Sequence, residues 1–153
     1  MQTQLSACRL VGACAVLSVI VAASPVSALQ LISVSEAALP TAQIRGQLRG
    51  ITRGPTVVII SPSPAAGFIH APLDLKIKFE TYGDAKIDTN SVLLTYMKIP
   101  AIDLTQRITS YIGTTGIDVK DAEVPPGTHT LRLDVTDTAG HSTWVEFTFT
   151  VSQ

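Results

Sequence analysis

From residue 55 onwards, apolar and polar residues alternate in short runs separated by turn residues, which is typical of half-buried strands. In the clearest run, 73–80, every second residue is apolar and the other four are charged. This run predicts a strand with one buried and one solvated face. Other strands are predicted at 56–61, 91–98, 130–135 and 143–151, with weaker candidates at 104–111 and 117–119. Seven short strands without a long helix predict an all-β fold, a single sandwich.

The last predicted strand carries the only tryptophan of the chain, Trp144. Four apolar residues of this strand share one parity and are expected to face inward: Val145, Phe147, Phe149 and Val151. Trp144 has the opposite parity, beside Glu146, so we expect it on the outer face. An outward aromatic ring is a candidate platform for a sugar or a partner protein. The alternatives are a ring that covers an apolar patch, a ring under the arginine-containing leader, or a ring buried by a strand bulge.

The first 28 residues have the pattern of a secretory signal peptide. Arg9 precedes the apolar run 10–23, and Val26-Ser27-Ala28 fits a cleavage site of small residues. The run is shorter than the roughly 20 residues of a membrane-spanning helix, which favours cleavage over a retained anchor. We therefore expect a periplasmic or secreted protein that begins at Leu29. Both cysteines lie within the signal, so no disulfide is expected.

Residues 29–54 lack strand alternation and contain three Arg-Gly pairs at a spacing of four, at Arg45, Arg49 and Arg53. Glycines at that spacing weaken a helix. We expect a flexible or short-helical leader, either a solvated tether or a basic arm for an acidic surface. The predicted organisation is thus a signal peptide at 1–28, a leader at 29–54 and a sandwich domain at 55–153.

The net charge of the chain and the motifs that it lacks argue against several functional classes. After the signal peptide the chain has ten basic and twelve acidic residues, a net charge of −2. This balance argues against a nucleic-acid binder, which needs an excess of lysine and arginine. Sequence signatures of serine hydrolases, zinc proteases and phosphate-binding loops are missing. We expect a non-catalytic protein without a cofactor; a Ser/His/Asp hydrolase, recognisable only by geometry, is a minor alternative.

Residues 55–153 resemble bacterial immunoglobulin-like domains. The resemblance is carried by the opening Pro55–Pro62, the middle segment Ile87–Val92, and the closing segments Pro126–Leu131 and Asp137–His141. It implies an immunoglobulin-like β-sandwich of about seven strands. It also implies a binding or structural module of the cell envelope, whose partner is a protein or a polysaccharide.

The chain is also similar to small periplasmic copper-resistance proteins of the CopC type, through Ser61-Pro62-x-Pro64-x-x-Gly67 and the Pro126-Gly127-Thr128 turn. This resemblance implies a metal-binding protein as the alternative function. The metal ligands would be three histidines and an aspartate brought together by the fold: His70, His129, His141 and Asp137. The chain departs from that family at the expected mature N-terminus, which is Leu29 and not histidine.

Overall fold

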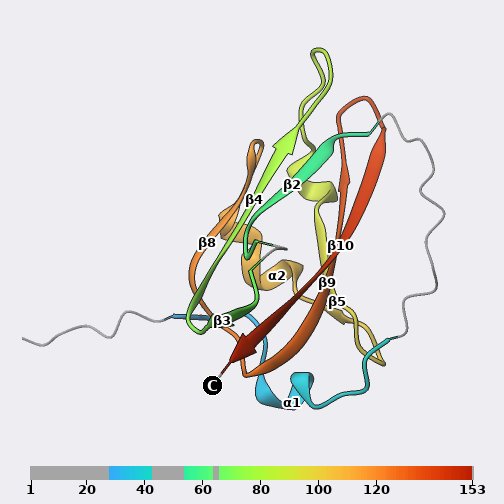
Figure 1. Cartoon of the computed structure of the whole chain (residues 1–153). Coiled ribbons are helices and arrows are strands. Elements are labelled where there is room, and N and C mark those ends of the chain that lie inside the picture. The colour runs from blue at the N-terminus through green and yellow to red at the C-terminus, as the bar shows by residue number, and fades with distance from the viewer. Residues whose placement is uncertain (1–27, 43–53, 64–65, 153) are drawn as a thin grey trace, which may run out of the picture.

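The computed structural model describes residues 28–42, 54–63 and 66–152, which form two β-sheets packed face to face (Figure 1). Sheet I has the order β1 (Leu29–Gln30), β8 (Gly116–Glu123), β4 (Leu73–Glu80), β2 (Thr56–Ser61), with β7 (Ile112–Gly113) paired to β8. Sheet II has the order β3 (Phe68–His70), β10 (Ser142–Ser152), β9 (Gly127–Thr136), β5 (Leu93–Tyr96), β6 (Ile102–Asp103). The predicted all-β sandwich is confirmed.

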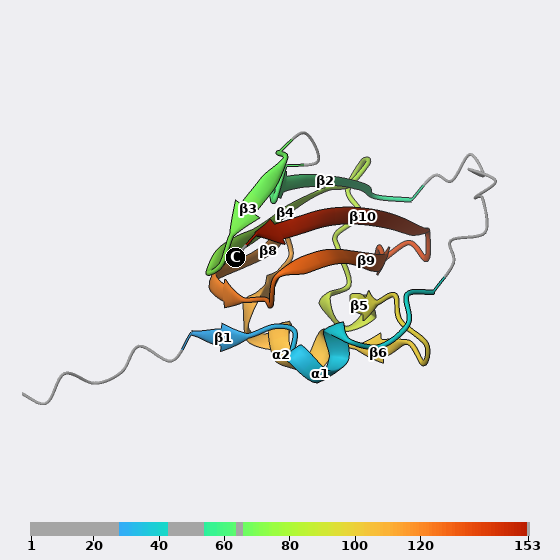
Figure 2. The same ribbon diagram turned by 60° about the horizontal axis from the view of Figure 1, so that its bottom comes forward.

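The order of the longer strands follows the immunoglobulin arrangement. In sheet I, β2, β4 and β8 are consecutive antiparallel neighbours, as strands A, B and E are in that fold. In sheet II, β10, β9 and β5 are antiparallel neighbours, as strands G, F and C are. The chain changes sheet between β2 and β3, and β3 joins the end of β10 in parallel (Figure 2).

Period-two alternation explains how these strands form the core. Along β4 the side chains alternate strictly between buried and exposed, as the sequence predicts. The inner faces of both sheets contribute the fully buried side chains at the centre, among them Leu75, Ile77, Leu94, Tyr96, Leu131 and Leu133. Phe147, Phe149 and Val151 are also buried, as expected, whereas Val145 is only half-buried.

The first half of the expected leader belongs to the domain, which corrects the predicted boundary at residue 55. Leu31 and Ile32 are at most 1% exposed and lie in the same core as the sandwich. β1 pairs in parallel with β8, and the helical turn α1 (Val34–Ala37) follows. Their burial could not be predicted because a short apolar pair has no periodicity. The Arg-Gly repeat at 45–53 lies outside the described residues, as does the predicted signal peptide up to residue 27.

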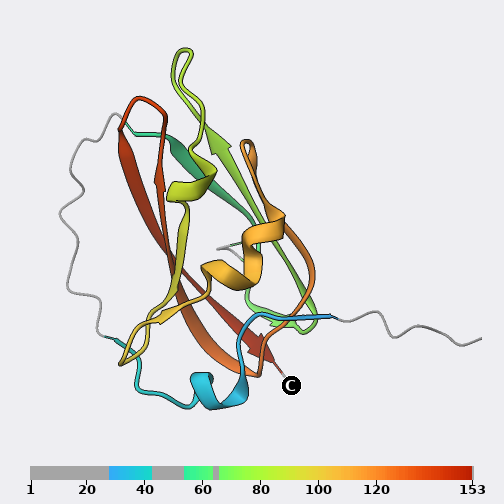
Figure 3. The same ribbon diagram turned by 180° about the vertical axis from the view of Figure 1, so that it is seen from behind.

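The weaker strand predictions are corrected in two places. Residues 104–111 form the helix α2 (Thr105–Ile108) and the 3₁₀ turn η2 (Thr109–Tyr111). Leu104 and Ile108 are both buried, and their spacing of four suits a helix. Together these turns connect β6 of sheet II with β7 of sheet I along one side of the sandwich (Figure 3). The candidate 117–119 is part of the eight-residue strand β8 inside sheet I.

The predicted strand 91–98 is shortened to β5, because a 3₁₀ turn, η1 (Thr89–Ser91), precedes it. Within the described residues, no helix has the length and apolar character needed to cross a membrane.

Candidate functional site

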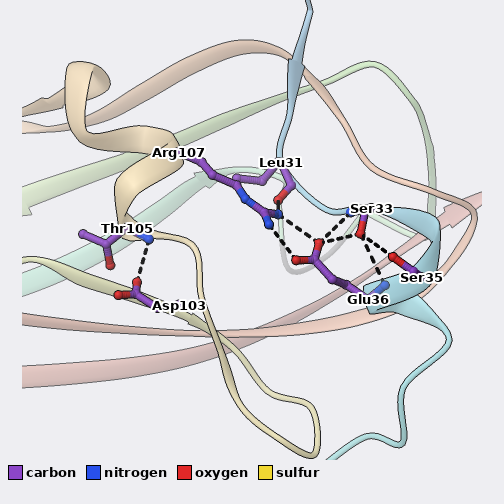
Figure 4. A network of polar contacts seen from close by, with 7 residues as sticks. All are labelled: Leu31, Ser33, Ser35, Glu36, Asp103, Thr105 and Arg107. Carbon is purple, nitrogen blue, oxygen red and sulfur yellow. Dashed lines mark hydrogen bonds and ion pairs between the residues drawn. The ribbon is translucent and has the colours of Figure 1, made fainter.

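The N-terminal segment 28–42 borders one end of sheet II and is held there by a polar network (Figure 4). Glu36 closes a capping box with Ser33 at the start of α1. Its carboxylate accepts two hydrogen bonds from the Arg107 guanidinium on α2, at 2.6 and 2.9 Å. Arg107 also donates to the Leu31 carbonyl at 2.7 Å. These bonds hold the pKa of Glu36 at about 2, far below its ordinary 4.5. The network is a structural anchor for the segment.

Lys98, directly after β5, ties the same segment to sheet II. Lys98 is 5% exposed, and its ammonium donates to the carbonyls of Ala37 and Leu39 and to the Thr41 hydroxyl, at 2.9 to 3.3 Å. The backbone N–H of Ala42 then donates to the Met97 carbonyl at 3.0 Å. The segment is therefore fixed against the residues that directly follow β5.

Trp144 lies on the outer face of sheet II, with the orientation that its parity predicted, and it is half-buried. Arg132 on β9 lies over its ring, with the guanidinium carbon 4.7 Å from the centre of the indole. Arg132 is itself oriented by two hydrogen bonds to Asp134, at 2.9 and 2.7 Å. Those bonds raise the pKa of Arg132 further, so the cation is permanent. Ring, cation and carboxylate thus form one ordered stack across the β9–β10 hairpin.

A hollow adjoins this stack on the side of β5. Its volume is about 440 Å³. The residues that line it are Ser91, Leu93, Thr95, Met97, Ala101, Arg132 and Asp134. Because Arg132 and Asp134 belong to both features, the hollow and the tryptophan stack make a continuous surface. We call it the binding face and define it as Leu93, Thr95, Met97, Arg132, Asp134, Trp144 and Glu146.

The binding face has more acidic than basic side chains. Glu146 stands directly opposite Arg132 in the strand register, and Asp103 stands opposite Thr95. Asp103, Asp134 and Glu146 therefore share this side of the sheet with one described cation, Arg132. One carboxylate oxygen of Glu146, Oε2, is buried and has no hydrogen-bond partner among the described residues. The face thus contains an acceptor that the described residues leave unsatisfied.

The outer face of sheet I differs in its charges. It contains a larger hollow of about 490 Å³, lined by Ile60, Tyr111 and residues of β4 and β8. There two exposed lysines have partners: Lys76 lies 3.4 Å from Asp118, and Lys78 lies 2.9 Å from Glu80. A third hollow of about 270 Å³ lies beside β1, and its lining includes Ile32 and Pro72. Neither place combines an oriented cation, an aromatic ring and an unsatisfied acceptor as the binding face does.

The structure keeps the three candidate metal-ligating histidines apart. His129 is in the core, where its ring nitrogens bond to the Tyr96 hydroxyl and the Pro125 carbonyl. His141 lies in the β9–β10 turn, roughly 25 Å further along the strand direction at about 3.3 Å per residue. His70 is exposed on β3 and bonds to Ser152. No group of three or more metal-binding side chains exists within the described residues. The alternative function, copper binding, required the three histidines to lie close together, and in this structure they do not.

Asp137 and His141 do lie close together, because both belong to the turn between β9 and β10. Asp137 Oδ1 accepts from the backbone N–H groups of Ala139 and His141, and Oδ2 lies 3.2 Å from the His141 ring. Burial alone would raise the pKa of Asp137, yet these hydrogen bonds lower it overall. The carboxylate closes the hairpin turn, a role common for aspartate in turns.

Sequence reasoning identified Trp144 but missed the residues that make its surroundings. Arg132, Asp134 and Leu93 come from strands whose pairing only the folded structure gives, and Met97 directly follows one of them, β5. The period-two spacing of Arg132 and Asp134 indicates that their side chains share a face of the strand. It does not indicate that Trp144 lies next to them.

Comparison of the chain with protein-family models, with curated proteins and with solved structures found no match.

Proposed function

We propose that this chain is an exported, non-catalytic binding module of the cell envelope, which holds a protein or polysaccharide partner on its binding face. The observation that carries the proposal is the stack of Arg132 on Trp144 at the rim of an open hollow. Tryptophan and arginine are the residue types that most often dominate binding energy at interfaces.

The rigidity of the face supports a binding role. Its side chains come from three neighbouring strands, β5, β9 and β10, except Met97, which directly follows β5. Arg132 is held by two hydrogen bonds, so little conformational entropy remains to be lost when a ligand contacts it. A preorganised surface of this kind suits recognition of a partner.

The arrangement around the histidines supports a non-catalytic role. The pair of His70 and Ser152, at 2.9 Å, resembles part of a nucleophile and its base. Both side chains lie at the exposed end of β3 and β10, and neither lines any of the three hollows described above. The buried His129 has both ring nitrogens engaged by Tyr96 and Pro125.

Site-specific photocrosslinking in the cells that produce the chain tests this proposal. A photoreactive phenylalanine analogue replaces Leu93 in the hollow or, as the control, Val58 on the outer side of β2. The two positions are similarly exposed, at 41% and 39%. We expect discrete adducts of the exported chain from position 93 that disappear in the Trp144→Ala background, and none from position 58. Absence of adducts at position 93 would contradict a binding role for this face.

A further inference from the structure

We propose that the ligand of the binding face is a basic peptide segment, with an arginine or lysine cation at Glu146 and an aliphatic side chain in the hollow at Leu93. This inference rests on the proposed function and names the chemistry of the partner. Three features of the face carry it: an unsatisfied carboxylate oxygen, an apolar hollow, and the separation between them.

The carboxylate of Glu146 requires a donor that the described residues do not provide. Arg132 lies opposite it, but the guanidinium donates to Asp134 and is stacked on Trp144. Glu146 Oε2 is left buried without a hydrogen-bond partner. A buried acceptor without a donor is costly, and more so when the group is charged. Oε2 itself has no accessible surface, so a ligand cation would pair with the half-buried carboxylate as a whole and balance its charge. This makes Glu146 a specificity-determining residue for positive charge.

The overall charge of the face favours the same ligand. Asp134 and Glu146 on the face, with Asp103 beside it on β6, outnumber the one described cation, so the local field attracts positive groups and repels phosphate- or uronate-rich polymers. By contrast, on the outer face of sheet I the Lys76–Asp118 and Lys78–Glu80 pairs balance their charges. A peptide segment with a basic and an aliphatic side chain combines the cation and the apolar group that this face would take.

The hollow provides the second contact. Leu93 is 41% exposed, and it shares the hollow with the Met97 and Ala101 side chains. A methionine adapts its shape to fill irregular gaps, so the hollow suits an aliphatic side chain of variable shape. Burying such a side chain contributes favourably in proportion to the apolar area removed from water.

The spacing of the two contacts matches a peptide in the polyproline II conformation. Glu146 pairs with Arg132, and Arg132 pairs with Thr95, so the three lie in one row across β10, β9 and β5. Two strand spacings separate Glu146 from the hollow, about 10 Å. In a polyproline II segment, which has three residues per turn and a rise of about 3.1 Å per residue, residues three apart lie on the same side and about 9 Å from each other. The expected motif is therefore a cation followed or preceded at the third position by an aliphatic residue.

Trp144 makes this proposal directly measurable, because it is the only tryptophan and lies within the face. The probe is an end-blocked peptide with two copies of Arg-Ser-Ser-Leu, titrated against the mature chain while tryptophan emission is followed. Matched peptides replace every arginine by glutamate or every leucine by serine. We expect saturable, salt-sensitive binding of the first peptide, none of the glutamate peptide, and weaker binding of the serine peptide.

Two protein variants locate the contacts. Glu146→Gln keeps the shape of the side chain and should raise Kd for the arginine peptide at least about tenfold, because the charge partner is lost. Glu80→Gln, on the other sheet, should leave Kd unchanged. Melting curves of both variants confirm that they are folded. Equal Kd values for the wild-type chain and Glu146→Gln would overturn the placement of the cation.

The titration is repeated on the Arg45→Ser/Arg49→Ser/Arg53→Ser variant, so that arginines of the chain itself cannot compete with the probe. If neither protein binds the arginine peptide while Leu93 still yields discrete crosslinks, the basic-peptide assignment is overturned and the binding module stands. If the crosslinks are also missing, the proposed function itself fails.

Discussion

The imidazole of His129 and the hydroxyl of Tyr96 form a 2.8 Å hydrogen bond in the core between the two sheets. The other ring nitrogen, Nε2, lies 2.8 Å from the Pro125 carbonyl oxygen. Since a carbonyl only accepts, Nε2 carries the proton and Nδ1 accepts from Tyr96. The ring is therefore neutral. A second proton would go to Nδ1, which could then no longer accept the hydrogen bond that Tyr96 donates.

This geometry predicts that the domain loses stability in mild acid. Burial, and to a lesser degree the Lys98 cation, lowers the pKa of His129 below its ordinary 6.5. The unfolded chain then binds the proton more strongly, so the free energy of unfolding should fall as pH drops through 6.5 and be fully retained above it. Urea unfolding between about pH 5 and pH 8 measures this. His129→Gln, which can keep both hydrogen bonds, should flatten the slope, whereas exposed His70→Gln should not. Equal slopes in all three proteins would refute the assignment.

A second acid-sensitive contribution is expected from Glu36. Its folded pKa of about 2 is below the ordinary 4.5, so its contribution is present above pH 4.5 and is lost as pH falls towards 2. Glu36→Gln leaves the guanidinium of Arg107 without its charged partner and should lower the free energy of unfolding at neutral pH by about 1–3 kcal/mol. Glu80→Gln removes an exposed pair with Lys78 and should change it by less than about 0.5 kcal/mol. Chemical denaturation compares the two, and equal effects would contradict a structural role for Glu36.

The corrected domain boundary predicts that a chain starting at residue 55 is much less stable than one starting at Leu29. Leu31 and Ile32 are fully buried, and burial of each side chain stabilises the folded domain by about 1.5–3 kcal/mol. The shortened chain lacks both contributions. It also leaves the Lys98 ammonium without its acceptors at Ala37, Leu39 and Thr41. The single substitution Leu31→Ala should already cost about 2–5 kcal/mol. Calorimetry of the three proteins tests this, and an unchanged melting temperature for the shortened chain would restore the boundary at 55.

A glycine in sheet I should be irreplaceable for steric reasons. Gly116 begins β8 with a φ of +155°, and a Cβ there would clash with the Ile77 carbonyl oxygen on β4. Gly116→Ala should therefore force the two strands apart and cost about 3 kcal/mol. Gly113→Ala is the matched control, since its Cβ would meet the nearest atom at an ordinary 3.5 Å. Thermal unfolding that ranks the two variants equally would contradict this explanation.

The strands could be predicted where each residue's environment follows from its immediate neighbours. In 73–80, strict alternation gave both the strand and its buried face, because successive side chains of an extended chain point to opposite sides. The same parity placed Trp144 on the outer face once Phe147 and Phe149 were taken as core. Local pattern failed at 104–111, where the buried pair Leu104 and Ile108 has helical spacing within a short segment of mixed polarity.

The binding face could not be predicted from any local pattern in the sequence. Arg132 lies over Trp144 because the β9–β10 hairpin pairs Trp144 with Asp134 and Glu146 with Arg132, and a register shift of one residue would send these side chains to the core. The hollow exists because β5, distant along the chain, pairs with the other edge of β9.

By itself, then, the sequence determined which segments extend and which of their sides avoid water, since both depend on alternation over a few residues. Tertiary structure decided which strands became neighbours. It thereby decided that His129 is sealed in the core by Tyr96, that Leu31 and Ile32 join the domain, and that Glu146 faces a cation already bound to another carboxylate. Such pairings depend on contacts between residues far apart in the chain, where the free energy of the whole packed molecule selects the partner.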